Sequence, residues 1–174
     1  MQLLFVCTGN ICRSPTAERL ARAYGVRSSV ENVFVASAGT RAVVGHPIHP
    51  DAVQVLERLG GVTTGFSARQ LTARIAAGAD LIITMTRAHR DSVLELAPSK
   101  LHRTFMLGEL AQLASRFDAE TVGDLPSVRS QLQATDALDV PDPIGLGPHA
   151  FEVAGALISD LIPPVMDLCA RSLD

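Results

Sequence analysis

The chain has 174 residues, 47% of them hydrophobic, which is enough for one domain with a substantial core over residues 1–174. Fifteen basic and 18 acidic residues give a net charge of −3, so the composition predicts neither a nucleic-acid partner nor attraction to an anionic membrane. Residues 1–6 are apolar without a basic flank, which excludes a signal peptide there. We expect no membrane span, because Pro163 and Pro164 interrupt the most apolar segment, residues 150–173.

The first elements are a strand, a polar loop and a helix. Residues 3–6 form an apolar run suited to a strand buried on both faces, and apolar residues from 17 to 24 follow with helical spacing. Ser14 is placed to cap this helix, Pro15 fits its first position, and Glu18 suits its first turn.

Strands and helices then alternate along the chain. Apolar runs predict strands at residues 33–36, 81–85 and 104–107. Helical stripes lie at residues 52–59, closed by Gly60 and Gly61, at 87–97, capped by Thr86 and ended by Pro98, and at 110–117.

The C-terminal third begins with a polar stretch. Residues 118–148 contain four prolines and predict a long loop with at most a short helix. A last helix covers residues 150–161, and Pro163 and Pro164 should kink or stop it. The alternation predicts an α/β fold with a parallel sheet covered on both faces, whose ligand lies beyond the carboxyl ends of the strands.

The loop after the first strand reads CTGNICRSP from Cys7 to Pro15. Amide groups between a strand end and a helix start can converge on an anion, Gly9 permits unusual φ, and Arg13 adds a bidentate fork for phosphate oxygens. The same positive field favours the thiolate of Cys7 and makes it a nucleophile. A Cys-x5-Arg pattern is weak alone, and the plainer alternative is a buried Cys7 beside a solvated Arg13.

Five stretches, the first of which contains this loop, carry a family resemblance. They are the opening VCTGNICRSPTAE (6–18), then SAGT (37–40), ARQL (68–71), ADLIITM (79–85) and DVPDP (139–143). Together they span nearly the whole chain, and the sequence resembles the low-molecular-weight protein tyrosine phosphatases. The resemblance implies a four-stranded parallel sheet flanked by helices on both faces.

The resemblance also implies roles for individual residues. Cys7 would be the nucleophile, Arg13 the phosphate clamp and Asp142 the general acid, with Asn10, Ser14 and Ser37 supporting the loop. The phosphate-binding residues would be Thr8, Gly9, Asn10, Ile11, Cys12, Arg13 and Ser14.

Asp142 also has a chemical rationale. An ionised thiol has no proton for the leaving oxygen, so a carboxylic acid must supply one, and Pro141 and Pro143 stiffen the loop that would hold it. Without the resemblance, Asp142 reads as an ordinary turn residue.

The expected aromatic walls of the substrate pocket are missing. Val43 and Val44 follow the SAGT segment and Ile144 follows Asp-Pro, where the family usually carries aromatic residues, and Phe66 stands where a supporting histidine is common. Ile11 favours an aryl phosphate over phosphoarginine, for which the family tends to use a smaller polar residue. The catalytic groups should therefore be intact, and recognition of the substrate's aromatic ring should be weaker.

The three cysteines, Cys7, Cys12 and Cys169, do not make a disulfide framework, which favours a reducing cytoplasm. Cys12 either resolves an oxidised Cys7 as a disulfide, as the resemblance also implies, or packs behind the loop. Cys169 is expected in the core.

No metal or other cofactor is predicted. His46 and His49 lack nearby partner ligands and read as loop residues, and His89 and His102 read as surface or core.

The sequence therefore predicts a cytoplasmic cysteine-dependent phosphomonoesterase, most simply a protein-tyrosine-phosphatase with redox regulation, acting on a phosphorylated protein or a small phosphomonoester. The alternatives are an arsenate reductase of the same fold, which the cysteine supply disfavours, a phosphatase for a non-tyrosine phosphomonoester, and a noncatalytic phosphate-binding module. The sequence makes no prediction of oligomeric state.

Overall fold

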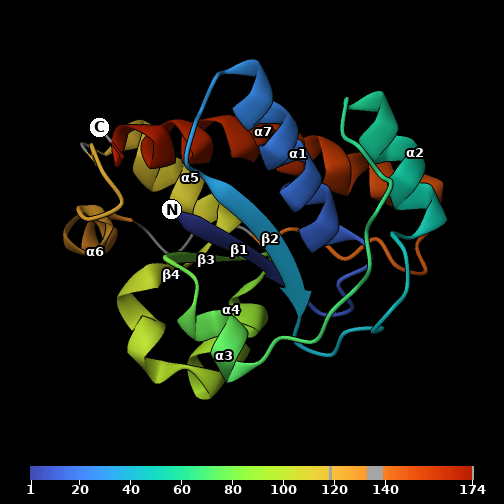
Figure 1. The fold of residues 1–174 in the computed structure, drawn as a ribbon, viewed down its shortest axis with the longest axis horizontal. Coiled ribbons are helices and arrows are strands. Elements are labelled where there is room, and N and C mark those ends of the chain that lie inside the picture. Colours follow the sequence, from blue (N-terminus) through green and yellow to red (C-terminus); the bar gives the residue numbers. More distant parts are fainter. Residues whose placement is uncertain (118, 133–138, 174) are drawn as a thin grey trace.

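A four-stranded sheet forms the centre of the computed structural model, which describes residues 1–117, 119–132 and 139–173. All neighbouring strands are parallel, in the order β2-β1-β3-β4. The strands are β1 (Gln2–Cys7), β2 (Phe34–Gly39), β3 (Leu81–Thr84) and β4 (Thr104–Met106). The predicted parallel α/β fold is confirmed (Figure 1).

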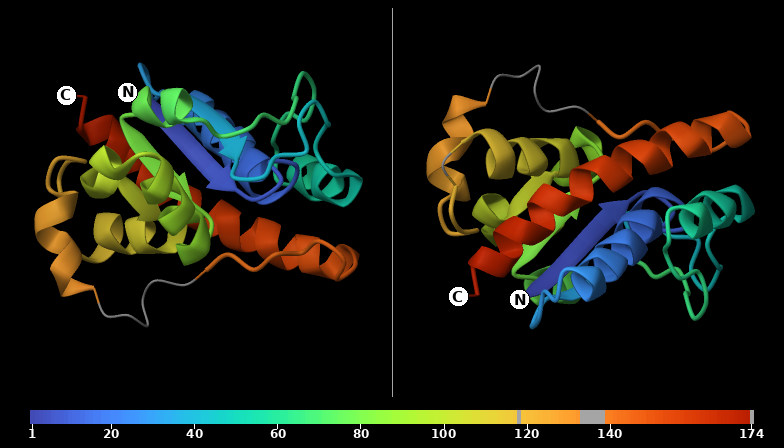
Figure 2. Two further views of the ribbon diagram at one scale, coloured as in Figure 1. Left: turned by 90° about the horizontal axis from the view of Figure 1, so that it is seen from below. Right: turned by 90° about the horizontal axis from the view of Figure 1, so that it is seen from above.

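Helices cover both faces of the sheet (Figure 2). Leu3 and Phe5 of β1 pack into one core cluster, and Leu4 and Val6 pack into the other, because successive strand side chains point to opposite faces. The first cluster includes side chains of α1 (Arg13–Arg27), α2 (Pro50–Arg58), α5 (Leu107–Arg116) and α7 (Pro148–Arg171). The second includes those of α3 (Ala73–Ala77) and α4 (Arg87–Leu96).

Short helices supplement the predicted elements. The 3-10 helix η1 (Pro98–Arg103) precedes β4, and α6 (Leu125–Val128) and η2 (Arg129–Gln131) lie within the stretch expected to be a loop with at most a short helix. Arg129 anchors η2: its Nε lies 2.7 Å from Glu109 Oε1, and its guanidinium lies 4.5 Å from the centre of the Phe105 ring.

The start of α1 differs from the prediction. Cys12 is the N-cap and makes no side-chain capping bond, so Ser14 lies inside the first turn, Pro15 is not the first residue, and Glu18 lies beyond that turn. The predicted Ser14 cap is wrong because its hydroxyl contacts Cys7 and Asn10 instead. Thr86, by contrast, caps α4 as predicted, accepting a hydrogen bond from the His89 amide.

Helix α7 runs through Pro163 and Pro164 to Arg171, so of the two predicted outcomes, a kink or a stop, the stop is wrong. Residues beyond the prolines, including Val165 and Leu168, are fully buried, and this packing holds the last turns although two amide donors are missing. By length and composition α7 could also cross a membrane, contrary to our expectation, but here its buried side belongs to the core beside α1 and α5.

Candidate functional site

The loop between β1 and α1 is held through its backbone carbonyl groups. The carbonyls of Thr8, Gly9 and Ile11 accept hydrogen bonds from the backbone amides of Arg41, Val43 and His49, at 3.0, 3.0 and 2.7 Å. Within the described part of the chain, the amide groups of residues 9–12 donate no hydrogen bond. A run of free N–H groups at a helix start is suited to an anion, as the sequence predicted.

Asn10 fixes the shape of this loop. Its φ is +55°, in the left-handed region, whereas Gly9 has no positive φ, so the conformational role predicted for Gly9 is wrong. The buried Asn10 amide donates to Ser14 Oγ at 3.0 Å and to Ser37 Oγ at 2.9 Å, while its oxygen accepts from the Arg69 backbone amide at 2.9 Å. These bonds offset the unfavourable backbone conformation.

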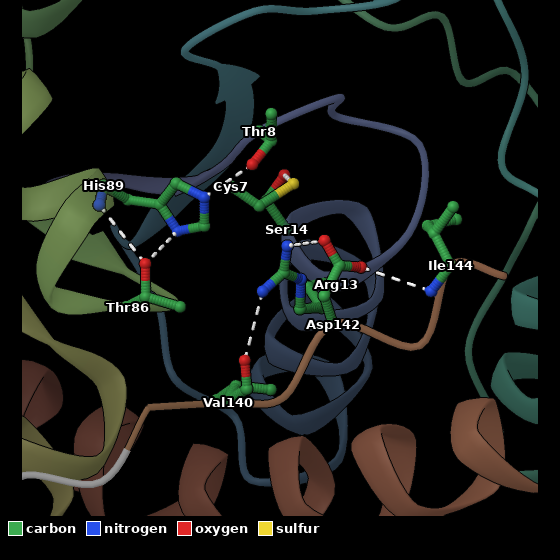
Figure 3. A network of polar contacts seen from close by, with 9 residues as sticks. All are labelled: Cys7, Thr8, Arg13, Ser14, Thr86, His89, Val140, Asp142 and Ile144. Carbon is green, nitrogen blue, oxygen red and sulfur yellow. Dashed lines mark hydrogen bonds and ion pairs between the residues drawn. The ribbon is translucent and has the colours of Figure 1, made fainter. Parts of the chain in front are cut away.

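Cys7 lies at the end of β1, with its Sγ 2.9 Å from Ser14 Oγ (Figure 3). Because the Ser14 oxygen already accepts from Asn10, its own proton is free to point at the sulfur. The Ser14 hydroxyl is thereby placed to donate a hydrogen bond to the Cys7 sulfur.

Arg13 and Asp142 meet beside this sulfur, although they are 129 residues apart (Figure 3). Arg13 is 4% exposed, its Nη2 lies 2.6 Å from Asp142 Oδ2, and its Nη1 donates to the Val140 carbonyl at 3.1 Å. The Asp142 side chain is half exposed. A buried guanidinium and an accessible carboxylate therefore share one end of the sheet.

The Asp142 segment is anchored to the core on both sides of the carboxylate. The Val140 amide donates to the Met85 carbonyl at 2.8 Å, and Asp139 accepts from the Arg87 amide at 2.8 Å. Pro143 is buried. The position of the carboxylate is thereby tied to the ends of β3 and α4.

Ser37 joins the loop to the buried carboxylate of Glu18, which the sequence assigned to the first turn of the helix and not to the site. Its hydroxyl accepts from Asn10 and donates to Glu18 Oε2 at 2.6 Å, and Glu18 also pairs with Arg22 at 2.8 Å. Phe66 packs under Arg19, with the guanidinium 5.6 Å from the ring centre. Glu18 and the Arg69 amide therefore support the loop although Phe66 cannot.

His89, predicted to lie at the surface or in the core, is buried and also contacts the loop, which the sequence did not predict. Its Nε2 lies 2.8 Å from Thr8 Oγ1, and its Nδ1 lies 2.9 Å from Thr86 Oγ1 (Figure 3). Burial and the nearby Arg13 charge lower the pKa of His89 to about 4, so the ring is neutral at pH 7. Thr86 accepts from the His89 amide and can donate to Nδ1, which leaves Nε2–H to donate to Thr8.

This ring predicts a pH dependence of stability. The pKa of about 4 in the folded protein is below the ordinary 6.5, so the unfolded chain binds a proton that the folded chain does not. The His89 contribution is complete above pH 6.5 and is lost as the pH falls toward 4, with a slope of up to ~1.4 kcal/mol per pH unit. The free energy of unfolding, measured with denaturant at pH 7, 6 and 5, should change less with pH in His89→Gln than in the unmodified protein. An unchanged slope, equal to that of the exposed control His102→Gln, would contradict the assignment.

The other predicted residues are placed as follows. Burial and the neighbouring Cys7 raise the pKa of the Cys12 thiol to about 12, and burial does the same for Cys169 in α7. His49 caps α2 and stacks on Phe151 at 4.8 Å. Among the described residues, no group of three or more His, Cys, Asp or Glu could hold a metal ion.

The rim of the loop is apolar but not aromatic. Val43 donates its amide to the Gly9 carbonyl, and Ile144 donates its amide to Asp142 Oδ1 at 3.3 Å, so both border the site. Val43, Val44 and Ile144 are 39%, 64% and 46% exposed. Val43 therefore leaves apolar surface open to solvent beside the loop, and Ile144 leaves it beside Asp142.

Comparison with known proteins matches this architecture. Residues 2–171 match the family model described as low molecular weight phosphotyrosine protein phosphatase. A probable low molecular weight protein-tyrosine-phosphatase, EpsP of Ralstonia nicotianae, is 40% identical over 110 residues, covering 63% of this chain and 72% of that protein.

Two solved structures are similar over nearly all of this chain. The low molecular weight protein tyrosine phosphatase of T. tengcongensis has a TM-score of 0.77 and 28% identity, covering 96% of this chain and 98% of that one. The YwlE arginine phosphatase from Geobacillus stearothermophilus has a TM-score of 0.73 and 28% identity, covering 95% and 90%. The chain belongs to the low molecular weight phosphotyrosine protein phosphatase family.

Proposed function

We propose that Cys7, Arg13 and Asp142 hydrolyse a phosphomonoester through a phosphocysteine intermediate, and that phosphotyrosine is the preferred substrate. The observation that carries this proposal is the meeting of the Arg13 guanidinium and the Asp142 carboxylate at 2.6 Å, beside Cys7 and a run of free loop amides. A noncatalytic phosphate-binding module would need the amides and Arg13 but neither a nucleophile nor an acid.

In the first step the Cys7 sulfur attacks phosphorus and the bond to the leaving oxygen breaks. The phosphate oxygens accept hydrogen bonds from the loop amides and from the Arg13 guanidinium. Arg13 thereby gives up its ion pair with Asp142 and binds the substrate instead. Asp142, half exposed and released from this ion pair, protonates the leaving oxygen in its acid form.

In the second step water attacks the phosphocysteine. Asp142, now ionised, accepts a proton from that water, the sulfur–phosphorus bond breaks, and Cys7 is regenerated as a thiolate with inorganic phosphate released. The Ser14 hydroxyl, 2.9 Å from the sulfur, stabilises that thiolate as a leaving group.

A turnover panel tests the proposal. Initial rates would be compared for phosphotyrosine, phosphoserine and phosphoarginine peptides and for small sugar phosphates, with and without a metal chelator. We expect phosphotyrosine to be hydrolysed fastest and the chelator to have no effect. The comparison of phosphotyrosine with phosphoarginine is the most informative one, because one similar structure is an arginine phosphatase.

Ring recognition should limit phosphotyrosine binding. Val43 and Ile144 offer aliphatic surface where a ring wall would add ~0.5–1.5 kcal/mol beyond area burial. Such a wall binds ground and transition states alike, so KM should be high while kcat is preserved.

Ile144→Tyr should therefore lower KM for phosphotyrosine by about two- to tenfold with little change in kcat. Val26→Tyr, at an 83% exposed position on α1, is the matched control. An unchanged KM in Ile144→Tyr, together with faster turnover of a non-aromatic phosphate, would contradict the phosphotyrosine assignment.

An arsenate reductase is the weaker alternative. Electron relay would need thiols beyond Cys7 and Cys12, and Cys169 is fully buried in α7 with its pKa raised to about 12. A buried, protonated thiol is a poor nucleophile for disulfide exchange.

We also expect redox regulation in a reducing cytoplasm, since all three cysteines are free. Peroxide would convert the Cys7 thiolate to a sulfenic acid, and Cys12 sulfur would then displace hydroxide to form a disulfide. Mild peroxide should inactivate the enzyme, a thiol reductant should restore it, and phosphate should protect. Because the pKa of Cys12 is raised to about 12, resolution should be slow relative to oxidation.

Peptide mapping after oxidation measures this outcome. Cys12→Ser should lose reversibility, whereas Cys169→Ser should keep it. Recovery of Cys7 only as sulfinic acid, with Cys12 free in the unmodified chain, would reject the disulfide.

A further inference from the structure

A hollow of about 220 Å³ lies between α1, β2 and the segment before α3, separate from the predicted phosphate site. Three arginine side chains line it, together with one acidic residue and two serines: Arg19, Arg22, Arg69, Glu18, Ser37 and Ser67. The lining is therefore strongly basic on a protein whose net charge is −3.

Several guanidinium donors in this hollow are unused. Arg19 has a side chain only 10% exposed, and its buried Nε has no hydrogen-bond partner, with Glu18 Oε1 3.7 Å away. Arg69 donates through Nε to the Ser37 carbonyl at 2.7 Å, but within the described residues its Nη1 and Nη2 donate to nothing. The buried Arg19 Nε without a partner is unfavourable, whereas Arg69 is exposed and its Nη groups are accessible, so together they suit a ligand that accepts several hydrogen bonds.

The acidic residue does not neutralise the cluster. Glu18 is already engaged by the Ser37 hydroxyl at 2.6 Å and by Arg22 Nη2 at 2.8 Å. One carboxylate faces three guanidinium groups, which leaves positive charge for an incoming anion. Guanidinium forks match the paired oxygens of a tetrahedral oxyanion, and the volume suits a small one.

We propose that this hollow is a second, noncatalytic site for inorganic phosphate, coupled to the first. The coupling runs through a continuous hydrogen-bonded chain, Glu18 to Ser37 to Asn10 to Ser14 to Cys7, with contacts of 2.6, 2.9, 3.0 and 2.9 Å. An anion that draws Arg19 and Arg22 away from Glu18 changes how Glu18 holds Ser37, and so the support of the catalytic loop. The identity of the anion rests on the proposed function, because phosphate is the product of that reaction.

The binding test needs no catalysis and so stands apart from the proposed function. Cys7→Ser protein would be titrated with inorganic phosphate at constant ionic strength, and amide NMR shifts would be followed at Gly9 and Ile11 and at Gly65 and Ser67. We expect two different dissociation constants. Adding Arg19→Gln and Arg69→Gln should weaken the constant at Gly65 and Ser67 by at least about tenfold. The exposed control Arg103→Gln should leave both constants unchanged.

A second variant, Arg19→Lys with Arg69→Lys, separates weaker binding from misfolding because it keeps both positive charges. It should weaken phosphate binding at the second site less than the glutamine variant does. No shift at Gly65 and Ser67, a single constant shared with the loop, or an unchanged constant in the glutamine variant would overturn the site. In the active enzyme, inorganic phosphate should lower kcat as well as raise the apparent KM. Purely competitive inhibition would overturn the coupling.

Discussion

Cys7→Ser should abolish turnover, by at least about 10⁴-fold in kcat, while the folded variant still binds phosphate. A serine hydroxyl is not ionised at neutral pH, so the attacking anion is lost. The loop amides and Arg13 are unchanged, and serine can keep the hydrogen bond to Ser14 Oγ that Cys7 makes at 2.9 Å. Anion binding and catalysis should therefore separate cleanly in this one variant.

The measurement pairs initial rates on an aryl phosphate with the phosphate dissociation constant. Cys169→Ser is the matched control, because that thiol is buried in α7 and outside the proposed mechanism. Full activity in Cys7→Ser would end the phosphocysteine mechanism. Loss of phosphate binding together with activity would point to a collapsed loop and would contradict the separate roles proposed here.

The sheet could be predicted from the sequence because its strands are short apolar runs buried on both faces. Residues 3–6 have no polar alternation, and Leu3 and Leu4 indeed pack into opposite core clusters. Helix α3 was missed because its five residues span too little of a helical period to leave a stripe. The continuation of α7 through Pro163 was missed because packing of distant segments, not local propensity, decides it.

The site was predictable only where it is contiguous in sequence. The loop from Cys7 to Ser14 contains the glycine, the arginine and the cysteines that together predict an anion-binding site. His89 and Glu18 give no such signal: His89 meets Thr8 across 81 residues, and Glu18 meets Ser37 across 19. A buried polar residue on a helix looks like any other until its partner is known.

Ser14 shows how one residue can fit a local rule and serve another purpose. Serine before a helical stripe predicts a cap, but its hydroxyl is occupied by Cys7 and Asn10, and the helix begins without a side-chain cap. Departures from local rules of this kind concentrate where a side chain is needed by a site.

Asp142→Ala should lower kcat for phosphate esters with poor leaving groups by about 10²–10⁴-fold, and less for leaving groups that are already stable anions. The reason is that a departing alkoxide needs a proton, whereas an acidic phenolate does not. Aryl phosphates of graded leaving-group pKa would show a steeper dependence of rate on that pKa in the variant. Asp160→Ala is the matched control, since that carboxylate is exposed on α7 and lies outside the segment that holds Asp142.

The same substitution should also tighten phosphate binding, in contrast to its effect on turnover. In the structure Asp142 Oδ2 holds Arg13 Nη2 at 2.6 Å, so a phosphate must displace a carboxylate before it can take the guanidinium. Removing that competitor, and its negative charge, should lower the dissociation constant for inorganic phosphate by about threefold or more. A variant that loses turnover of poor leaving groups and binds phosphate more tightly separates the acid from the clamp. Weaker phosphate binding in Asp142→Ala would mean that Asp142 orders Arg13 for the anion rather than competing with it.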